Sequence, residues 1–319
     1  MKFHAFAAVM FLTCCSGMAK PSDLFDFVPR NSCQVLKLDL VAIEKMEIWQ
    51  NDTFKNFSRQ ANFDGEKYNP RQISGMATEI LIVNPVLMKD TTFIFVRTEL
   101  TKEAFLSKLE QITGVRHISV KTRNRTEYRI TLPPIQFPPG DTPASRTFSF
   151  AFLSPHSIVF AKDSLDDFWT FKPLGLPLEK RKYFQAKNFL AGGFLETDPA
   201  FLQEKSFLPP FQRLIYFFAA DPPGALRFQA EAACVDKAAA NQVLMMFQQY
   251  VMIGGLFFNQ AAPELMQEWT QGINILQNDT VVRMKADFSK GFLTRLLSAA
   301  EKPVQRPGQP EKKQDDSKR

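Results

Sequence analysis

Cysteine and histidine are scarce in this chain, with four and three residues out of 319. Two of the cysteines, Cys14 and Cys15, lie within the first 19 residues, so only Cys33 and Cys234 remain in the body of the protein. Both belong to apolar, strand-like stretches, which favours buried free thiols, although export would also permit a disulfide between them. No histidine or further cysteine lies near either one, and two thiolates do not complete a zinc site. We therefore expect no bound metal and no cofactor.

Motifs that mark common enzyme classes are also missing. The sequence has no Gly-x-Ser-x-Gly elbow, no phosphate-binding glycine loop, no dinucleotide fingerprint and no His-Glu-x-x-His helix. Of the three histidines, His4 lies in the N-terminal segment, and we interpret His117 and His156 as structural residues at a strand and in a turn. These absences weigh against an enzyme without excluding one, because carboxylate-based sites have no short signature. We assign no catalytic residue.

An acidic cluster supplies the one catalytic alternative. Asp163, Asp166 and Asp167 fall at the start of a short helix expected over residues 163–171. Carboxylates in a first helical turn are favoured by the helix dipole, and this is our interpretation of all three. A carboxylate pair can also act as general acid and base, so an exported carboxylate-based hydrolase stays open.

Positive charge is not concentrated in any one segment. The formal net charge is +6, of which the first 19 residues hold one lysine, and residues 301–319 hold six basic and four acidic side chains. The body therefore carries only +3 (6 − 1 − 2), with both signs mixed along it. A nucleic-acid-binding protein is expected to show a basic stripe with interleaved aromatic residues. We infer that nucleic acid is not a partner.

No apolar run is long enough for a transmembrane helix, which needs about 20 residues. The apolar stretch over 243–258 is interrupted by Gln248, Gln249 and a Gly-Gly pair. The sequence therefore predicts no membrane span.

The N-terminus instead has the pattern of a targeting segment. Lys2, a short apolar run and small residues before Lys20 predict a signal peptide over residues 1–19. The residues around Cys14 and Cys15 also loosely resemble a bacterial lipobox, in which a cysteine becomes the lipidated first residue. Soluble export, to the periplasm or beyond, and a lipid anchor at Cys14 or Cys15 both remain open.

Most of the sequence repeats one pattern, in which a strand of alternating apolar and polar residues is followed by a helix with an N-cap residue. Residues 226–234 alternate apolar and polar side chains, which is typical of a strand with one buried face. Asp236 follows as an N-cap, and apolar residues at helical spacing predict a long helix beyond it. The same pattern recurs at 93–112, where Thr101 is the expected cap, and near the C-terminus, where Ser289 caps the last helix.

Phenylalanine is the one abundant aromatic residue, with 32 copies against three tryptophans and five tyrosines. Phe is bulky and has no polar group, so its abundance predicts a Phe-rich core. A cavity for an apolar ligand is the alternative interpretation.

The order of these elements predicts an α+β protein with two related halves, residues 20–172 and 188–302. We expect each half to be a mainly antiparallel sheet with helices packed on one face, because each strand alternates buried and exposed positions. Residues 173–187 contain proline, glycine and a run of charges, which predicts a linker. Residues 303–319 are almost entirely polar, which predicts a disordered tail.

The opening of the expected mature chain also carries a resemblance. Phe-Val-Pro at 27–29, followed by the apolar strand and Asp-Leu at 35–40, resembles the start of uncharacterised exported bacterial proteins of the domain-of-unknown-function type. The strand–helix segments at 93–112 and 281–299 are similar in kind. The resemblance implies export and a duplicated α+β fold, and it implies no activity and no site residue.

Taken together, these patterns favour a non-catalytic cell-envelope protein that binds a partner protein or a surface component. An exported hydrolase is the first alternative, and a carrier of a lipid or other apolar ligand is the second. The partner itself is not indicated by the sequence.

Overall fold

The computed structural model describes residues 23–46, 75–86, 91–122, 125–132, 146–171, 175–197, 211–221, 224–261 and 263–301. The predicted signal peptide and the predicted tail lie outside the described residues. The sequence also predicts a helix over residues 41–60, after the first strand, and most of that range lies outside the described residues too. The described part of that helix is α2 (Leu40–Glu44), where the Asp39 carboxylate accepts a hydrogen bond of 2.8 Å from the Ala42 amide.

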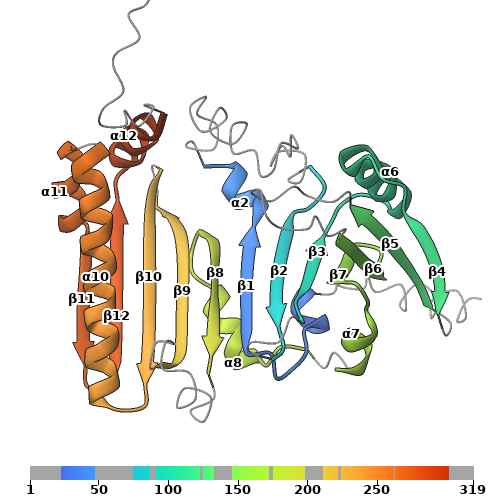
Figure 1. Ribbon diagram of the computed structural model, residues 1–319, viewed down its shortest axis with the longest axis horizontal. Coiled ribbons are helices and arrows are strands. Elements are labelled where there is room, and N and C mark those ends of the chain that lie inside the picture. The colour runs from blue at the N-terminus through green and yellow to red at the C-terminus, as the bar shows by residue number, and fades with distance from the viewer. Residues whose placement is uncertain are drawn as a thin grey trace, which may run out of the picture.

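Twelve strands form one continuous antiparallel open sheet, which Figure 1 shows running from β11 at one end to β4 at the other. In order across the sheet, the strands are β11 (Ile273–Asn278), β12 (Val281–Phe288), β10 (Ala225–Cys234), β9 (Phe211–Asp221), β8 (Phe189–Glu196), β1 (Gln34–Asp39), β2 (Glu79–Asn84), β3 (Phe93–Arg97), β7 (Ser157–Lys162), β6 (Arg146–Ser154), β5 (Arg125–Leu132) and β4 (Ile118–Thr122).

The predicted antiparallel α+β class is confirmed, but the strands do not form two separate sheets. β1 and β8 pair directly, with Val35 opposite Phe194, and this pairing joins the strands before and after the predicted linker into one sheet. The predicted linker itself contains two short helices, and Leu176 and Phe184 within it are buried in the core. Local alternation did not predict the β1–β8 contact, because it shows which face of a strand is buried and not which strand lies beside it.

Helices lie on both faces of the sheet, rather than on one face as the sequence predicted. One face, here called the α10 face, carries the long helices, and the other, the η1 face, carries short ones. The helices are η1 (Leu24–Phe27), α6 (Lys102–Thr113), α7 (Asp166–Thr170), α8 (Leu178–Arg181), η2 (Lys182–Phe184), α10 (Lys237–Ala261), α11 (Pro263–Gln271) and α12 (Lys290–Glu301).

The predicted helix caps are confirmed. The Thr101 hydroxyl accepts a hydrogen bond from the Ala104 amide at the start of α6, and Gly114 ends that helix in a left-handed conformation with a φ of 65°. The Asp236 carboxylate accepts from the amide of Ala239 at 2.7 Å, which fixes the start of α10. Ser289 caps α12 in the same way.

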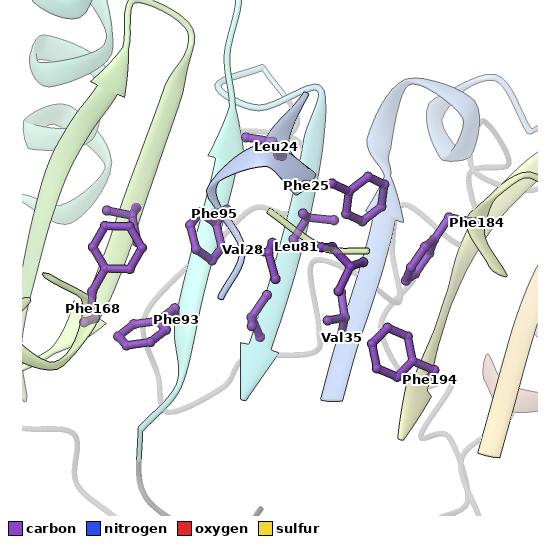
Figure 2. Close-up of a cluster of buried hydrophobic side chains, with 14 of the residues drawn as sticks. Leu24, Phe25, Val28, Val35, Leu81, Phe93, Phe95, Phe168, Phe184 and Phe194 are labelled. Atoms are coloured by element: carbon purple, nitrogen blue, oxygen red, sulfur yellow. The ribbon is translucent and has the colours of Figure 1, made fainter. Parts of the chain in front are cut away.

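Phenylalanine fills the core on the η1 face (Figure 2). Phe168 of α7 packs edge-on against Phe93 and Phe95 of β3, with ring centroids 5.4 and 5.7 Å apart. On the other side of this cluster, the Phe25 ring of η1 lies 4.9 Å from that of Phe184. Edge-to-face aromatic pairs such as those of Phe168 with Phe93 and Phe95 contribute about 0.5–1.5 kcal/mol beyond their buried area. The predicted Phe-rich core is thus present.

On the α10 face, the helices cover the two ends of the sheet. At the β4–β7 end, Phe105 of α6 packs against Phe152 and Phe160. At the β9–β12 end, Val243 and Phe247 of α10 are buried against β10 and β12. Within the described residues, no helix is both long and apolar enough to cross a membrane.

The η1 face is uncovered at the β10–β12 end within the described residues. There β12 presents exposed Arg283, Lys285 and Asp287, and β11 presents exposed Leu276. The strict alternation that the sequence shows in 281–288 therefore has the expected cause, a strand with one wet face.

Candidate functional site

The acidic cluster predicted from the sequence lies where β7 turns into α7, and all three carboxylates are exposed. Asp163 adopts a left-handed backbone conformation with a φ of 62°, which makes the turn. The Asp166 carboxylate accepts a hydrogen bond of 2.7 Å from the Ser164 hydroxyl, and Asp167 belongs to the first turn of α7. Each aspartate thus has a local role in starting the helix.

The two histidines of the body make separate structural contacts. Nδ1 of His117 lies 2.8 Å from the Glu110 carboxylate, which links the start of β4 to α6. Nδ1 of His156 lies 3.1 Å from the carbonyl oxygen of Thr98, which links the β6–β7 turn to the end of β3. The structure does not bring these imidazoles together with the aspartates of α7.

Cys33 and Cys234 are free thiols, as predicted. Two strands, β8 and β9, lie between β1, which follows Cys33, and β10, which ends at Cys234. Burial raises the pKa of both thiols, so both are poor nucleophiles and poor metal ligands at neutral pH. Among the described residues, no group of three or more His, Cys, Asp or Glu side chains is arranged to hold a metal ion.

A pocket of about 530 Å³ opens instead between β5 and β6. Pairing between these strands stops at Tyr128 opposite Phe150, although β5 continues to Arg125 and β6 to Ser154. A register shift between Phe152 and Ser154, in the pairing of β6 with β7, marks a bulge at this end of β6. Bulges bend a strand and increase its twist, which accounts for the divergence of β6 from β5.

Aromatic and cationic side chains line this pocket, and they come from both faces of the sheet because the pocket lies between two strands. The lining residues are Phe27, Lys102, Arg125, Thr126, Tyr128, Ala151, Phe152, Leu153 and Trp169. The volume lies within the usual range for small-molecule sites, about 300–1,000 Å³.

Arg125 and Trp169 form the η1-face side of the pocket. The Arg125 guanidinium lies 4.1 Å from the centre of the indole ring, in cation–π contact. The indole Nε1 donates a hydrogen bond of 2.8 Å to the carboxylate of Glu127, which is 6% exposed. Because Arg125 and Glu127 alternate with Thr126 along β5, both point to this face, and together they hold the indole in one orientation.

Lys102 stands on the opposite side, as the first residue of α6 after the Thr101 cap. Its ammonium group lies 5.3 Å from the ring centre of Tyr128 and 5.6 Å from that of Phe152. Within the described part of the chain, the ion pairs include neither Lys102 nor Arg125. Among the residues that the structure describes, these two positive charges thus have no carboxylate partner, and each is placed on an aromatic ring.

The sequence analysis missed this site. Arg125 and Glu127 have the polar alternation of an ordinary solvated strand, and Trp169 lies 42 positions beyond Glu127. The available signal is the scarcity of tryptophan in a chain rich in phenylalanine, because an indole N–H needs a partner when it is buried. That signal identifies a residue but not its neighbours.

No family model matches this chain, and no curated protein and no solved structure matches it either.

Proposed function

We propose that this chain is an exported, non-catalytic binding protein whose ligand enters the β5–β6 pocket. The ligand we propose is an organic anion with an aromatic or apolar portion, presented by a component or partner of the cell envelope. The observation that carries the proposal is the pair of cations, Lys102 and Arg125, held on aromatic rings around one opening. Export is supported by the sequence of residues 1–19.

The charges of the pocket support an anionic ligand. Lys102 and Arg125 are the charged residues of its lining, and both are cations. A bound carboxylate, sulfate or phosphate would make charge-assisted hydrogen bonds with these groups, and such bonds are stronger than neutral ones. The rings of Tyr128, Phe152 and Trp169 would cover the apolar portion of the same ligand.

We further infer that the sheet is built from two related halves that meet at β1 and β8. The strand order supports this inference. In the first half β1, β2 and β3 are adjacent, α6 follows β3, and the last strand, β7, returns to pair with β3. In the second half β8, β9 and β10 are adjacent, α10 follows β10, and the last strand, β12, returns to pair with β10.

The pocket lies where these two halves differ. After β12 the second half has one more strand, β11, and the sheet ends there. After β7 the first half has β6, the counterpart of β11, and then the additional hairpin of β4 and β5. The pocket lies between β6 and this additional hairpin. An element added to one copy of a repeated unit is a natural place for a function that the other copy lacks.

A matched pair of dyes tests the proposal. 8-Anilinonaphthalene-1-sulfonate carries a sulfonate on an aromatic body, and N-phenyl-1-naphthylamine is the same body without the charge. We expect the sulfonate to bind more tightly, with energy transfer from Trp169. Arg125→Gln and Lys102→Gln each remove one cation, and each should weaken sulfonate binding about tenfold while leaving the neutral dye unaffected.

Arg213→Gln is the control, because Arg213 also lies over an aromatic ring, that of Tyr183, but outside the pocket. This variant should bind both dyes as the wild type does. Equal binding of the two dyes by the wild type contradicts the proposal. So does a loss of sulfonate binding in the Arg213 variant as large as that in the Arg125 and Lys102 variants.

A further inference from the structure

The outward side of α10 carries the densest group of exposed apolar residues in the described chain. Five of its large side chains, Met245, Tyr250, Met252, Ile253 and Leu256, are between 54 and 65% exposed. The inward side of the same helix is buried against the sheet through Val243 and Phe247. A helix with an apolar side toward the core and a second one toward solvent has a surface that is suited to a partner.

Three of these residues form a regular seam with Gln249. Met245, Gln249, Met252 and Leu256 are separated by four, three and four positions, which is the heptad spacing of a helix-pairing seam. The spacing also reads the same in both directions. A second α10 running antiparallel across a two-fold axis would therefore place Met245 opposite Leu256 and Gln249 opposite Met252.

Charge indicates which partner fits this surface. Lys237, the first residue of α10, is the only charged residue in the helix, which runs for 25 residues. The whole chain carries a net charge of +6, so two copies repel one another unless they meet on an uncharged surface. Homodimer interfaces are depleted in charge and enriched in methionine at their centre. An interfacial membrane helix, by contrast, is rich in Lys and Arg on its polar side.

The seam is also held in a fixed position. Trp269 of α11 packs against α10, and its Nε1 donates a hydrogen bond of 2.9 Å to the carbonyl oxygen of Val251 in that helix. A Cβ at Gly254 would lie 2.7 Å from the Trp269 ring, so the two helices are in close contact there. A rigid surface loses little conformational entropy on association.

We propose that two copies of this chain associate through antiparallel pairing of their α10 helices along the seam Met245–Gln249–Met252–Leu256. This inference does not depend on the proposed ligand. The α10 helix packs near β10, and the pocket lies between β5 and β6. Six strands of the sheet separate β10 from β6, namely β9, β8, β1, β2, β3 and β7. Both pockets would therefore stay open in the dimer, and a surface that displays many copies of a ligand would be bound by two sites at once.

The oligomeric state tests the proposal. We expect sedimentation equilibrium to give a mass approaching twice that of one chain, which is 36.4 kDa for the full sequence, as the concentration rises from about 1 to 100 µM. Met252→Lys places a charge in the seam opposite Gln249 of the other copy, and it should raise the dissociation constant at least about tenfold. Leu276→Lys is the matched control, since Leu276 is equally exposed but lies on β11, and it should leave the mass unchanged.

Cysteine cross-linking tests the register of the pairing. With Met245→Cys and Leu256→Cys in one chain, mild oxidation should give a covalent dimer, because these positions face one another across the axis. Met245→Cys alone should not, since its two copies would be about 16 Å apart along the helices, beyond the reach of a disulfide. Wild-type protein, oxidised in the same way, is the control for disulfides formed by the native thiols Cys33 and Cys234.

Both substituted positions are exposed, so the variants should fold, and circular dichroism checks this. A mass that stays at that of one chain throughout the concentration range overturns the proposal. So does a monomer that binds phosphatidylcholine vesicles through α10, or a dimer that survives Met252→Lys and shows no cross-link between positions 245 and 256.

Discussion

The guanidinium of Arg181 lies 2.8 Å from the carboxylate of Asp26, although 155 positions separate the two residues in the chain. The same side chain donates from Nε to the carbonyl oxygen of Leu176 at 2.7 Å, and its guanidinium lies 5.8 Å from the ring centre of Phe25. Arg181, the last residue of α8, thus fixes η1 against the sheet. The short helices of the η1 face owe their position to this contact as well as to the aromatic core beneath them.

We expect Arg181→Leu to lower the free energy of unfolding by about 1–2 kcal/mol. Leucine keeps the apolar stem but removes the contacts to Asp26 and Leu176, so η1 loses its polar attachment. Urea denaturation measures the change, and Arg283→Leu is the control. Arg283 pairs with Glu231 on the exposed part of the sheet, so its loss should change stability by no more than about 0.5 kcal/mol. Equal effects of the two substitutions would contradict the structural role of Arg181.

The close approach of β1 and β8 depends on Gly193. A Cβ at this position would lie 2.2 Å from the carbonyl oxygen of Val35, which is backbone and cannot rotate away. We expect Gly193→Ala to lower the free energy of unfolding by about 1–3 kcal/mol. Gly291→Ala is the control, because Gly291 is exposed on α12 with only side-chain atoms nearby, and alanine there should be neutral or stabilising by up to about 1 kcal/mol. A tolerated alanine at 193 would mean that β1 and β8 are farther apart.

Trp169 and Glu127 form a pair in which each partner needs the other. Trp169→Phe removes the donor and leaves a buried carboxylate without its hydrogen bond, so stability should fall by about 1–3 kcal/mol. Replacing both partners, as in Trp169→Phe with Glu127→Met, should recover most of that loss, because no buried polar group is then left unpaired. Thermal unfolding of the two variants gives the comparison. A double variant whose losses simply add would show that the hydrogen bond contributes little.

Export makes a prediction about the first residue of the mature chain. In a bacterial host, we expect intact-mass analysis to find a chain that begins at Lys20. Ala19→Arg alters the residue before the cleavage site and should block processing. A mature chain that begins at Cys14 or Cys15 with an added lipid mass would establish the anchored alternative. An unprocessed wild-type chain would contradict both forms of export.

Local structure could be predicted well from this sequence, and long-range contacts could not. The caps at Thr101, Asp236 and Ser289 are formed by residues three positions or fewer from their partners, so the sequence alone specifies them. The β1–β8 pairing joins residues about 160 positions apart, and the sequence of either strand does not specify which strand pairs with it. The expectation of a mainly antiparallel sheet for each half did not include this pairing, which joins the twelve described strands into one sheet.

The pocket was missed for a related reason. It depends on a bulge in β6, on the end of a ladder between β5 and β6, and on an indole from α7. Alternation predicts the faces of β5 and β6 but not the point at which two strands stop pairing. The close backbone approach at the glycine pair 192–193 likewise depends on the neighbouring strands β1 and β9, which the local sequence does not specify.

The lowered pKa of Asp287 predicts how the stability of the fold depends on pH. This residue lies directly opposite Arg227 on β10, which donates to it at 2.8 Å, and Lys285 lies 3.2 Å away. Partial burial acts to raise the pKa of this carboxyl, but hydrogen bonds from Arg227 and Lys285 outweigh it, and the pKa of Asp287 is lowered. The pKa of an aspartate in an unfolded chain is about 3.9. The stabilising contribution is therefore complete above that pH and is lost as the pH falls through the lower folded value.

Asp287→Asn should therefore unfold at a lower temperature than the wild type at pH 6, and the difference should shrink as the pH falls below about 4. Below the lowered pKa of the folded protein, the wild-type carboxyl is neutral, like the amide that replaces it. Scanning calorimetry of both proteins across this range measures the difference. In an Arg227→Gln background the same substitution should have a smaller effect at pH 6, because one of its two cationic partners is gone. A difference that grows as the pH falls would require a raised pKa, and that would contradict the hydrogen bonds seen between β10 and β12.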